Sequence, residues 1–323
     1  MYTIQPYNIQ YYDQWNDFVA RSKNGTFLFH RDFMEYHADR FTDYSLLVFN
    51  DNKLVALLPA NRVGDVVYSH QGLTYGGILL TAQNKLADVI HIVRAILKYL
   101  NDRGITAFSA KSIPDIYHKM PAQEMEYTLF VAGAKLVRRD GLSVYDILGT
   151  FPFTKKRLEA IRRGEKNNLL IVEEPNFDLF WNEILIPNLK EKHEAAPVHT
   201  AEEIKFLHSK FPENIRHFNV YNNGTIVAGT TVFITDTVAK PQYISGNPDK
   251  NQLGSLDYLY NHLIRNVFKE KQYFDLGPSH DPDSRKLKEG IIFWKESFGA
   301  RTLNHDFYEV PTVNFINLDN ALI

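Results

Sequence analysis

The chain of 323 residues has no cysteine, which excludes disulfides, thiolate metal sites and cysteine nucleophiles. No stretch approaches the roughly 18 apolar residues of a membrane-spanning helix. The first ten residues lack the charged and apolar regions of a secretion signal. The net charge of −2 gives no general attraction for nucleic acid or an anionic membrane. We therefore expect a cytoplasmic protein without integral membrane segments.

Metal ligation is not expected either. The histidines that cluster in the second half are His193, His199, His208 and His217. Their spacings of six and nine residues do not place two imidazoles on adjacent turns of one helix. We expect no metal.

The composition is that of a folded protein, with 44% hydrophobic and 13% aromatic residues. The length suits two domains of ordinary size. Charges balance in each half, with 15 basic and 15 acidic residues up to Thr150 and 21 and 23 after it. Any charged surface must therefore be local.

The second half repeats the plan of the first. A strand, polar turn and strand at 49–56 has a counterpart at 221–228, 172 positions later. Each hairpin precedes an amphipathic helix (about 84–101 and 256–269), a short apolar strand and a closing helix. The closing helices end in Gly133-Ala134-Lys135 and Gly299-Ala300-Arg301, 166 positions apart. We predict two similar α/β units, each a mixed sheet flanked by helices, over 1–150 and 151–323, with a helical insert at about 176–211. A ligand site between them would be typical of two-domain proteins.

Several segments carry a family resemblance. They are Lys155-Lys156-Arg157 with Ile161-Arg162-Arg163, Ile226–Gly229, Gln242–Ser245, Phe274–Ser279, and Gly290 with Phe293–Ala300. In this order they resemble the GNAT acyltransferase fold present twice, as in the Fem-type (FemABX-like) aminoacyltransferases of peptidoglycan bridge synthesis and related acetyltransferases. The resemblance covers nearly the whole chain.

One stretch departs from the GNAT pattern. GNAT domains that use acyl-CoA usually hold its pyrophosphate with a Gln/Arg-x-x-Gly-x-Gly/Ala loop at a helix N-terminus. The matching stretch here is Asn251–Leu256, with Asn at the first position and Leu at the last. Fem-type proteins also tend to lack this loop, because their donor is aminoacyl-tRNA. The resemblance thus implies acyl-CoA or aminoacyl-tRNA as the donor.

Two residues are catalytic candidates. By resemblance, the lysine after an aromatic residue in the Gly…Phe–Lys…Phe–Gly segment lies at the active site, and Trp294-Lys295 holds that position. Its ammonium could stabilise an oxyanion, or Lys295 could be a solvated lysine on the closing helix. His280 follows a strand end, beside Ser279, and could accept a proton from an amine or simply belong to a turn.

The basic helix Lys155 to Lys166 is a candidate for anion binding. The window Thr154 to Asn168 holds six basic and two acidic residues. Lys155, Arg157 and Arg162 could bind a diphosphate, a nucleotide or the backbone of tRNA, or form an ordinary charged face.

Four further residues are candidates for substrate binding, and one of them is Ser279, in the loop after the strand that ends in Leu276. Tyr75 lies in the glycine-rich stretch His70–Gly77, which could approach a ligand or make a bulge and turn. Tyr243 lies near a strand end, and Arg40 closes an aromatic helix from which it could reach a phosphate.

These observations lead to one main hypothesis and two alternatives. The chain is expected to be an N-acyl- or aminoacyltransferase that joins an activated acyl group to an amine of a phosphorylated or cell-envelope, peptidoglycan-precursor-like acceptor. Because the GNAT unit is already paired within one chain, we expect a monomer. The alternatives are a non-catalytic ligand-binding protein on a degenerate scaffold, and a chain in which one unit is purely architectural.

Overall fold

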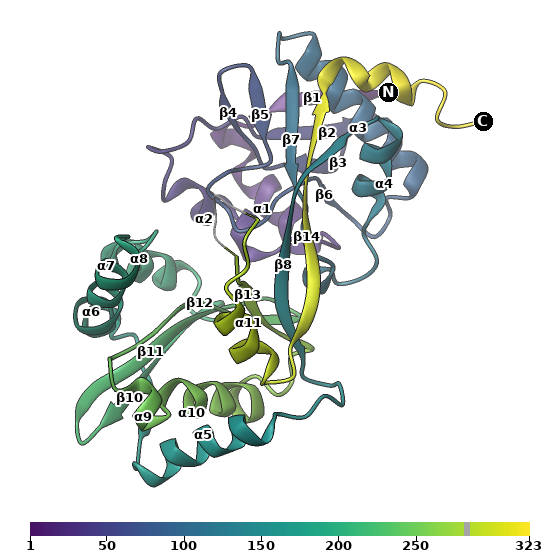
Figure 1. The fold of residues 1–323 in the computed structure, drawn as a ribbon. Helices are drawn as coiled ribbons and strands as arrows, with labels where there is room; N and C mark the ends of the chain where they lie inside the picture. Colours follow the sequence, from purple (N-terminus) through teal and green to yellow (C-terminus); the bar gives the residue numbers. More distant parts are fainter. Residues whose placement is uncertain (281–284) are drawn as a thin grey trace. The chain divides into compact units, whose positions relative to one another are not determined.

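The structure is a computed structural model that describes residues 1–280 and 285–323, with only the backbone of Lys192 and His193. The chain forms two compact units. Unit 1 comprises Met1–Asp140 and Asn304–Ile323, and unit 2 comprises Gly141–Leu303. The chain passes into unit 2 along β8 (Lys135–Asp146) and returns along β14 (Arg301–Pro311) (Figure 1).

Unit 1 contains two groups of strands. An antiparallel sheet has the order β1-β2-β3-β6, and β4, β5, β7 and β14 follow one another in a second sheet. The strands are β1 (Tyr2–Pro6), β2 (Leu46–Asn50), β3 (Lys53–Leu58), β4 (Asn61–Val63), β5 (Val66–Tyr68), β6 (Leu79–Leu80) and β7 (Ala107–Lys111). The helices are α1 (Tyr12–Arg21), α2 (Arg31–Glu35), α3 (Leu86–Asn101) and α4 (Glu124–Val131).

The core of unit 1 forms where α3 packs against the strands. The apolar stripe of α3 includes Val89, Val93 and Ile96, which are buried together with Leu46 of β2 and other strand residues. A 3-10 helix, η6 (Thr312–Leu318), adds Leu318 to the same core. The C-terminal segment therefore belongs to unit 1, a difference from the division at residue 150 expected from the sequence.

Unit 2 is built on a mixed sheet of order β8-β13-β12-β11-β10-β9. The strands are β9 (Leu170–Glu173), β10 (Ile215–Asn222), β11 (Thr225–Ile234), β12 (Val238–Gly246) and β13 (Tyr273–Pro278). The helices are α5 (Lys155–Lys166), α6 (Phe177–Phe180), α7 (Ile186–His193), α8 (Ala201–Lys210), α9 (Lys250–Leu253), α10 (Ser255–His262) and α11 (Glu289–Glu296). The π-helical turns η4 (Trp181–Leu185) and η5 (Leu263–Val267) extend α6 and α10.

Two glycines let α5 and α10 pack backbone against backbone. A Cβ on Gly164 of α5 would lie 2.4 Å from Cβ of Tyr258, and a Cβ on Gly254 would lie 2.3 Å from the carbonyl oxygen of Ala160. Gly254 also has a left-handed φ of +72°, which favours glycine. Glycine at these two positions therefore allows the basic helix α5 to lie in close contact with the rest of unit 2.

The repeated plan predicted from the sequence is present. The hairpins β2–β3 and β10–β11 precede α3 and α10–η5, then β7 and β13, then α4 and α11 (Figure 1). No helix within the described residues combines the length and apolarity that crossing a bilayer requires.

Candidate functional site

Lys295 is the buried centre of the candidate site in unit 2. It is only 6% exposed, and it is the one residue of α11 that is buried. Its Nζ donates hydrogen bonds to the carbonyl oxygens of Gly277 (2.9 Å) and Pro278 (2.7 Å), at the end of β13. Burial lowers the pKa of Lys295 to about 8; the charge of Lys240 adds to this effect, and that of Asp275 opposes it.

A second lysine and a buried aspartate complete the site. Asp275 of β13 is 1% exposed, and its Oδ2 lies 3.0 Å from Nζ of Lys240 on β12. The parallel pairing of Val238 with Tyr273 and of Ala239 with Phe274 brings the next residues, Lys240 and Asp275, side by side. An isolated buried charge is costly, so the ion pair accounts for both residues being tolerated here.

Asp275 also shapes the turn that receives Lys295. Its Oδ1 accepts a hydrogen bond of 2.7 Å from the backbone N–H of Gly277. Gly277 has φ +73°, and a Cβ there would lie 3.3 Å from Nζ of Lys240. The aspartate thus orients the backbone whose carbonyl groups hold Lys295.

Ser279 and His280 follow directly after this turn. Ser279 is 4% exposed, and its Oγ has no hydrogen-bond partner among the described residues. Its carbonyl oxygen accepts a bond of 2.8 Å from the N–H of Lys288, and His280 forms an isolated β-bridge with Leu287. The structure therefore brings Ser279 and Lys295 to the same strand end.

The arrangement suits the binding of a negative charge. Among the described residues, the two ammonium groups and one carboxylate leave a net positive charge in a largely buried place. An ammonium has three N–H donors, and two of those of Lys295 are used on backbone carbonyls. The third can donate to an oxyanion, where a charge-assisted bond in a poorly solvated site is strong.

Lys240 and Asp275 were not among the sequence-based candidates. Asp275 lies within the segment Phe274–Ser279 that carried the family resemblance. Its position inside a strand did not indicate a functional role. The available sign was a charged residue inside each of two strands, β12 and β13. Only their pairing in the sheet shows that the two charges meet.

The basic helix divides into one buried and several exposed cations. Arg157 is 7% exposed; it forms an ion pair with Asp257 and donates to Oγ of Ser297 (2.8 Å). Burial lowers the pKa of Arg157, while Asp257 opposes the shift. These contacts tie α5 to α10 and α11. Lys155 and Arg162 are exposed on the outer face of α5, where they remain predicted anion ligands.

The N-terminus of α10 does not fit a pyrophosphate. This is the place where an acyl-CoA loop would hold its phosphates. The backbone of α5 packs closely on it at Gly254, where an added Cβ would lie 2.3 Å from the carbonyl oxygen of Ala160. The first turn also carries Asp257, which is occupied by its ion pair with Arg157 and its hydrogen bond from Trp294. The structure therefore agrees with the departure from the loop pattern at Asn251–Leu256.

Tyr243 lies between the sheet and the helical insert. It is 8% exposed, and its hydroxyl accepts a hydrogen bond of 3.0 Å from the N–H of His199. Its ring packs edge-on against Trp181 at 5.0 Å between centroids. These contacts anchor the insert, and a role of Tyr243 in substrate binding stays a prediction.

Arg40 and Tyr75 belong to unit 1. Arg40 is exposed after α2, with its guanidinium 5.7 Å from the ring of Tyr36. Tyr75 is 1% exposed; its hydroxyl donates to Oγ1 of Thr26 (3.1 Å), and its ring packs on Tyr117. The structure gives Tyr75 a place in the interior, and substrate binding by either residue stays a prediction.

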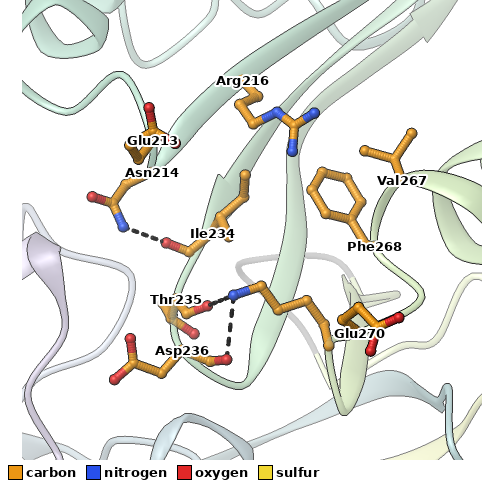
Figure 2. A pocket seen from close by; sticks show the side chains of 10 residues that line it. Glu213, Asn214, Arg216, Ile234, Thr235, Asp236, Val267, Phe268 and Glu270 are labelled. Atoms are coloured by element: carbon orange, nitrogen blue, oxygen red, sulfur yellow. Dashed lines mark hydrogen bonds between the residues drawn. The ribbon is translucent and has the colours of Figure 1, made fainter.

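A cavity of about 340 Å³ in unit 2 lies apart from these residues (Figure 2). Glu213, Asp236 and Glu270 face Arg216 and Lys271 around it. Lys271 donates to the carbonyl oxygens of Thr235 and Asp236, and Arg216 is paired with Glu173. Both cations that line the cavity, Arg216 and Lys271, therefore already have partners, and none of the predicted site residues lines it.

No group of three or more histidine, aspartate or glutamate residues in the described part of the chain is placed to hold a metal.

Comparison with known proteins identifies the fold. No family model and no curated protein matches the sequence. Among solved structures, FemX matches with a TM-score of 0.71 and 9% identity over 98% of this chain and 99% of FemX. L-PGS from Bacillus licheniformis matches with a TM-score of 0.61 and 12% identity over 95% of both chains. The C-terminal domain of a putative lysylphosphatidylglycerol synthetase from Agrobacterium fabrum matches with a TM-score of 0.59 and 13% identity, over 98% of this chain and 96% of that one. The tandem α/β fold expected from the resemblance to Fem-type proteins is therefore confirmed.

Proposed function

We propose that the chain is an N-acyl- or aminoacyltransferase that acts on an amine of a phosphorylated or cell-envelope acceptor. The observation that carries the proposal is the buried ammonium of Lys295, with one donor left beyond the two carbonyl groups that orient it. The fold shared with FemX and L-PGS supports the same class of reaction.

The proposed step is an addition followed by an elimination. The lone pair of the acceptor amine attacks the carbonyl carbon of the donor, and the carbonyl oxygen becomes an oxyanion that accepts a hydrogen bond from Lys295. Collapse forms the amide and expels the donor's leaving group, and the proton of the attacking nitrogen passes to that group or to solvent. No covalent enzyme intermediate is needed.

The donor is acyl-CoA or aminoacyl-tRNA, and the packing of α10 bears on the choice. The close packing of α5 on the N-terminus of α10 at Gly254 favours aminoacyl-tRNA over acyl-CoA. The exposed face of α5, with Lys155 and Arg162, is the proposed contact for phosphates of the donor or acceptor. We propose that the protein works as a monomer in the cytoplasm.

Calorimetric titration of the purified full chain with acyl-CoA, aminoacyl-tRNA and a UDP-linked muropeptide tests binding. A Lys295→Met variant should retain binding but lose roughly 10²- to 10³-fold in the rate of amide formation, since one oxyanion donor is removed. Lys269→Met, an exposed lysine elsewhere in unit 2, is the matched control. Binding without amide formation by the native chain would favour the alternative, a non-catalytic binding protein. Absence of binding to all three compounds would refute the proposal.

A further inference from the structure

Two consecutive residues of α11 attach this helix to different parts of unit 2. Successive residues of a helix point about 100° apart. Lys295 reaches the end of β13, whereas Trp294 packs against Tyr260 of α10, with 5.2 Å between ring centroids. The indole N–H of Trp294 donates a hydrogen bond of 2.9 Å to Oδ1 of Asp257, also on α10. The contacts of both residues therefore fix the rotation of α11 about its axis.

Arg157 of α5 holds the same side of α11 as Asp257 does. Its Nε donates to Oγ of Ser297 (2.8 Å), and its guanidinium lies 5.5 Å and 4.6 Å from the ring centres of Trp294 and Phe298. These three positions lie together at the end of α11, because residues three and four apart along a helix are neighbours. Arg157 is also ion-paired with Asp257. We call Arg157, Asp257 and Trp294 the α11 clamp.

The α11 clamp is both charged and buried. Arg157 and Asp257 are each 7% exposed. A buried ion pair is often no more stabilising than well-packed apolar residues of similar volume, so stability alone does not account for this pair. A guanidinium differs from an apolar group in direction, because its planar fork bonds to acceptors at fixed angles. The clamp therefore resists a rotation of α11 that apolar packing alone would permit.

We propose that the α11 clamp positions Lys295 for the transfer step. This inference rests on the proposed function, in which the third N–H of Lys295 meets the oxyanion. Because the other two N–H groups bond to the carbonyl oxygens of Gly277 and Pro278, the direction of the third follows from where α11 places the side chain. A rotation of α11 misdirects that N–H. In this proposal Arg157 does not bind the anion itself, in contrast to the prediction from the sequence.

Two conservative substitutions test the clamp. Trp294→Phe keeps a ring against Tyr260 but removes the N–H that Asp257 accepts, and Arg157→Lys keeps the charge but removes the fork. With aminoacyl-tRNA and the UDP-linked muropeptide as substrates, we expect each variant to lower kcat roughly tenfold or more and to change KM less than about twofold, because small errors of position are costly in catalysis. A raised KM with unchanged kcat in Arg157→Lys would show that Arg157 binds the anion, and it would overturn the proposal.

The pKa of Lys295 provides a second measurement that needs no turnover. Burial lowers this pKa to about 8 from its ordinary value of 10.5, with Lys240 adding to the shift and Asp275 opposing it. If α11 turns, Lys295 loses part of its burial, so its pKa should rise in both clamp variants. NMR titration of labelled lysine side chains in the full chain measures the change.

Two substitutions in the same unit are matched controls. Trp181→Phe removes another buried indole N–H, which donates to the carbonyl oxygen of His199 (3.0 Å). Arg216→Lys removes another guanidinium fork, which is paired with Glu173. We expect neither control to change the pKa of Lys295, and circular dichroism checks the fold of all four variants.

Two further results would contradict the positioning role. One is an equal rise of the pKa of Lys295 in Trp181→Phe, which would indicate a general loosening of unit 2. The other is an unchanged pKa and kcat in both clamp variants, which would leave the clamp with a purely stabilising role. If the native chain forms no amide, the proposed function fails, and a pKa of Lys295 that rises only in the clamp variants supports the clamp separately.

Discussion

At the scale of single residues, the buried charges of unit 2 control one another. Lys240 lowers the pKa of Lys295, while Asp275 opposes that shift and pairs with Lys240. The protonation state of Lys295 therefore depends on a residue that need not touch the substrate. This coupling is directly measurable.

We predict that Lys240→Met raises the pKa of Lys295 above its present value of about 8. The substitution removes a like charge that lowers this pKa and leaves the charge of Asp275, which raises it. If the ammonium form of Lys295 stabilises the oxyanion, kcat/KM is high below the pKa of Lys295 and falls above it. The alkaline limb of the pH profile of kcat/KM should then move to higher pH. NMR titration of labelled lysine side chains measures the same shift without turnover, and an unchanged pKa contradicts the assignment. Lys269→Met is the control.

A buried carboxyl group in unit 1 links stability to pH. Burial raises the pKa of Glu126 to about 7, above its ordinary value near 4.5. The folded state therefore holds this proton more tightly than the unfolded chain, and stability falls as pH rises from about 4.5 through about 7. Glu126→Gln should raise the free energy of unfolding by about 1–3 kcal/mol at pH 8 and by little at pH 4.

Urea unfolding at the two pH values measures the difference. Glu309→Gln, an exposed position on β14 of the same unit, is the control and should show no such pH dependence. If Glu126→Gln changed the free energy of unfolding equally at both pH values, the change would not come from ionisation of the Glu126 carboxyl group.

At the scale of elements, the packing of α5 on α10 depends on small residues. Gly164→Ala should cost about 1–3 kcal/mol of unfolding free energy, because the new methyl group would meet Cβ of Tyr258 at 2.4 Å and separate the helices. Gly290→Ala in α11 is the opposite case, because nothing lies within 4 Å of its Cβ position. It should stabilise by roughly 0.5–1 kcal/mol through helix propensity. Thermal and urea unfolding measure both changes, and similar effects of the two substitutions would contradict the packing argument.

Most elements followed from the pattern of the sequence. The apolar stripe of the helix expected at about 84–101 appears as α3, and the hairpin turns at 51–52 and 223–224 adopt positive φ as their residue types suggest. The closing helix of unit 2, α11, was expected, but the burial of its Lys295 was not. Periodicity shows which side chains share a face, and it does not say that the buried face belongs to a lysine.

At the scale of the molecule, the C-terminal segment completes unit 1. Val310 of β14 and Leu318 of η6 are buried in its core, and β14 pairs with β7. The two units are therefore not consecutive pieces of chain, because unit 2 is inserted between β8 and β14 of unit 1.

We predict that truncation after Leu303 unfolds unit 1, because it deletes a central strand partner and two core side chains. Truncation after Asn320 removes three residues only and keeps Leu318, so it should leave unit 1 folded. Circular dichroism and resistance to proteolysis distinguish the two truncated chains. A protease-resistant unit 1 lacking residues 304–323 would contradict the assignment of that segment.

The sequence by itself determined the duplicated order of elements, the tandem fold and the absence of cysteine chemistry, because these depend on residue type and on spacing along the chain. It also led to the prediction of Lys295 as a site residue. Only the tertiary structure decided that Lys240 and Asp275 form an ion pair, that Arg157 is held by Asp257, and that 304–323 returns to unit 1. The physical reason is that the free energy of a buried charge depends on its partner in space, and strand pairing joins residues that are 35 positions apart.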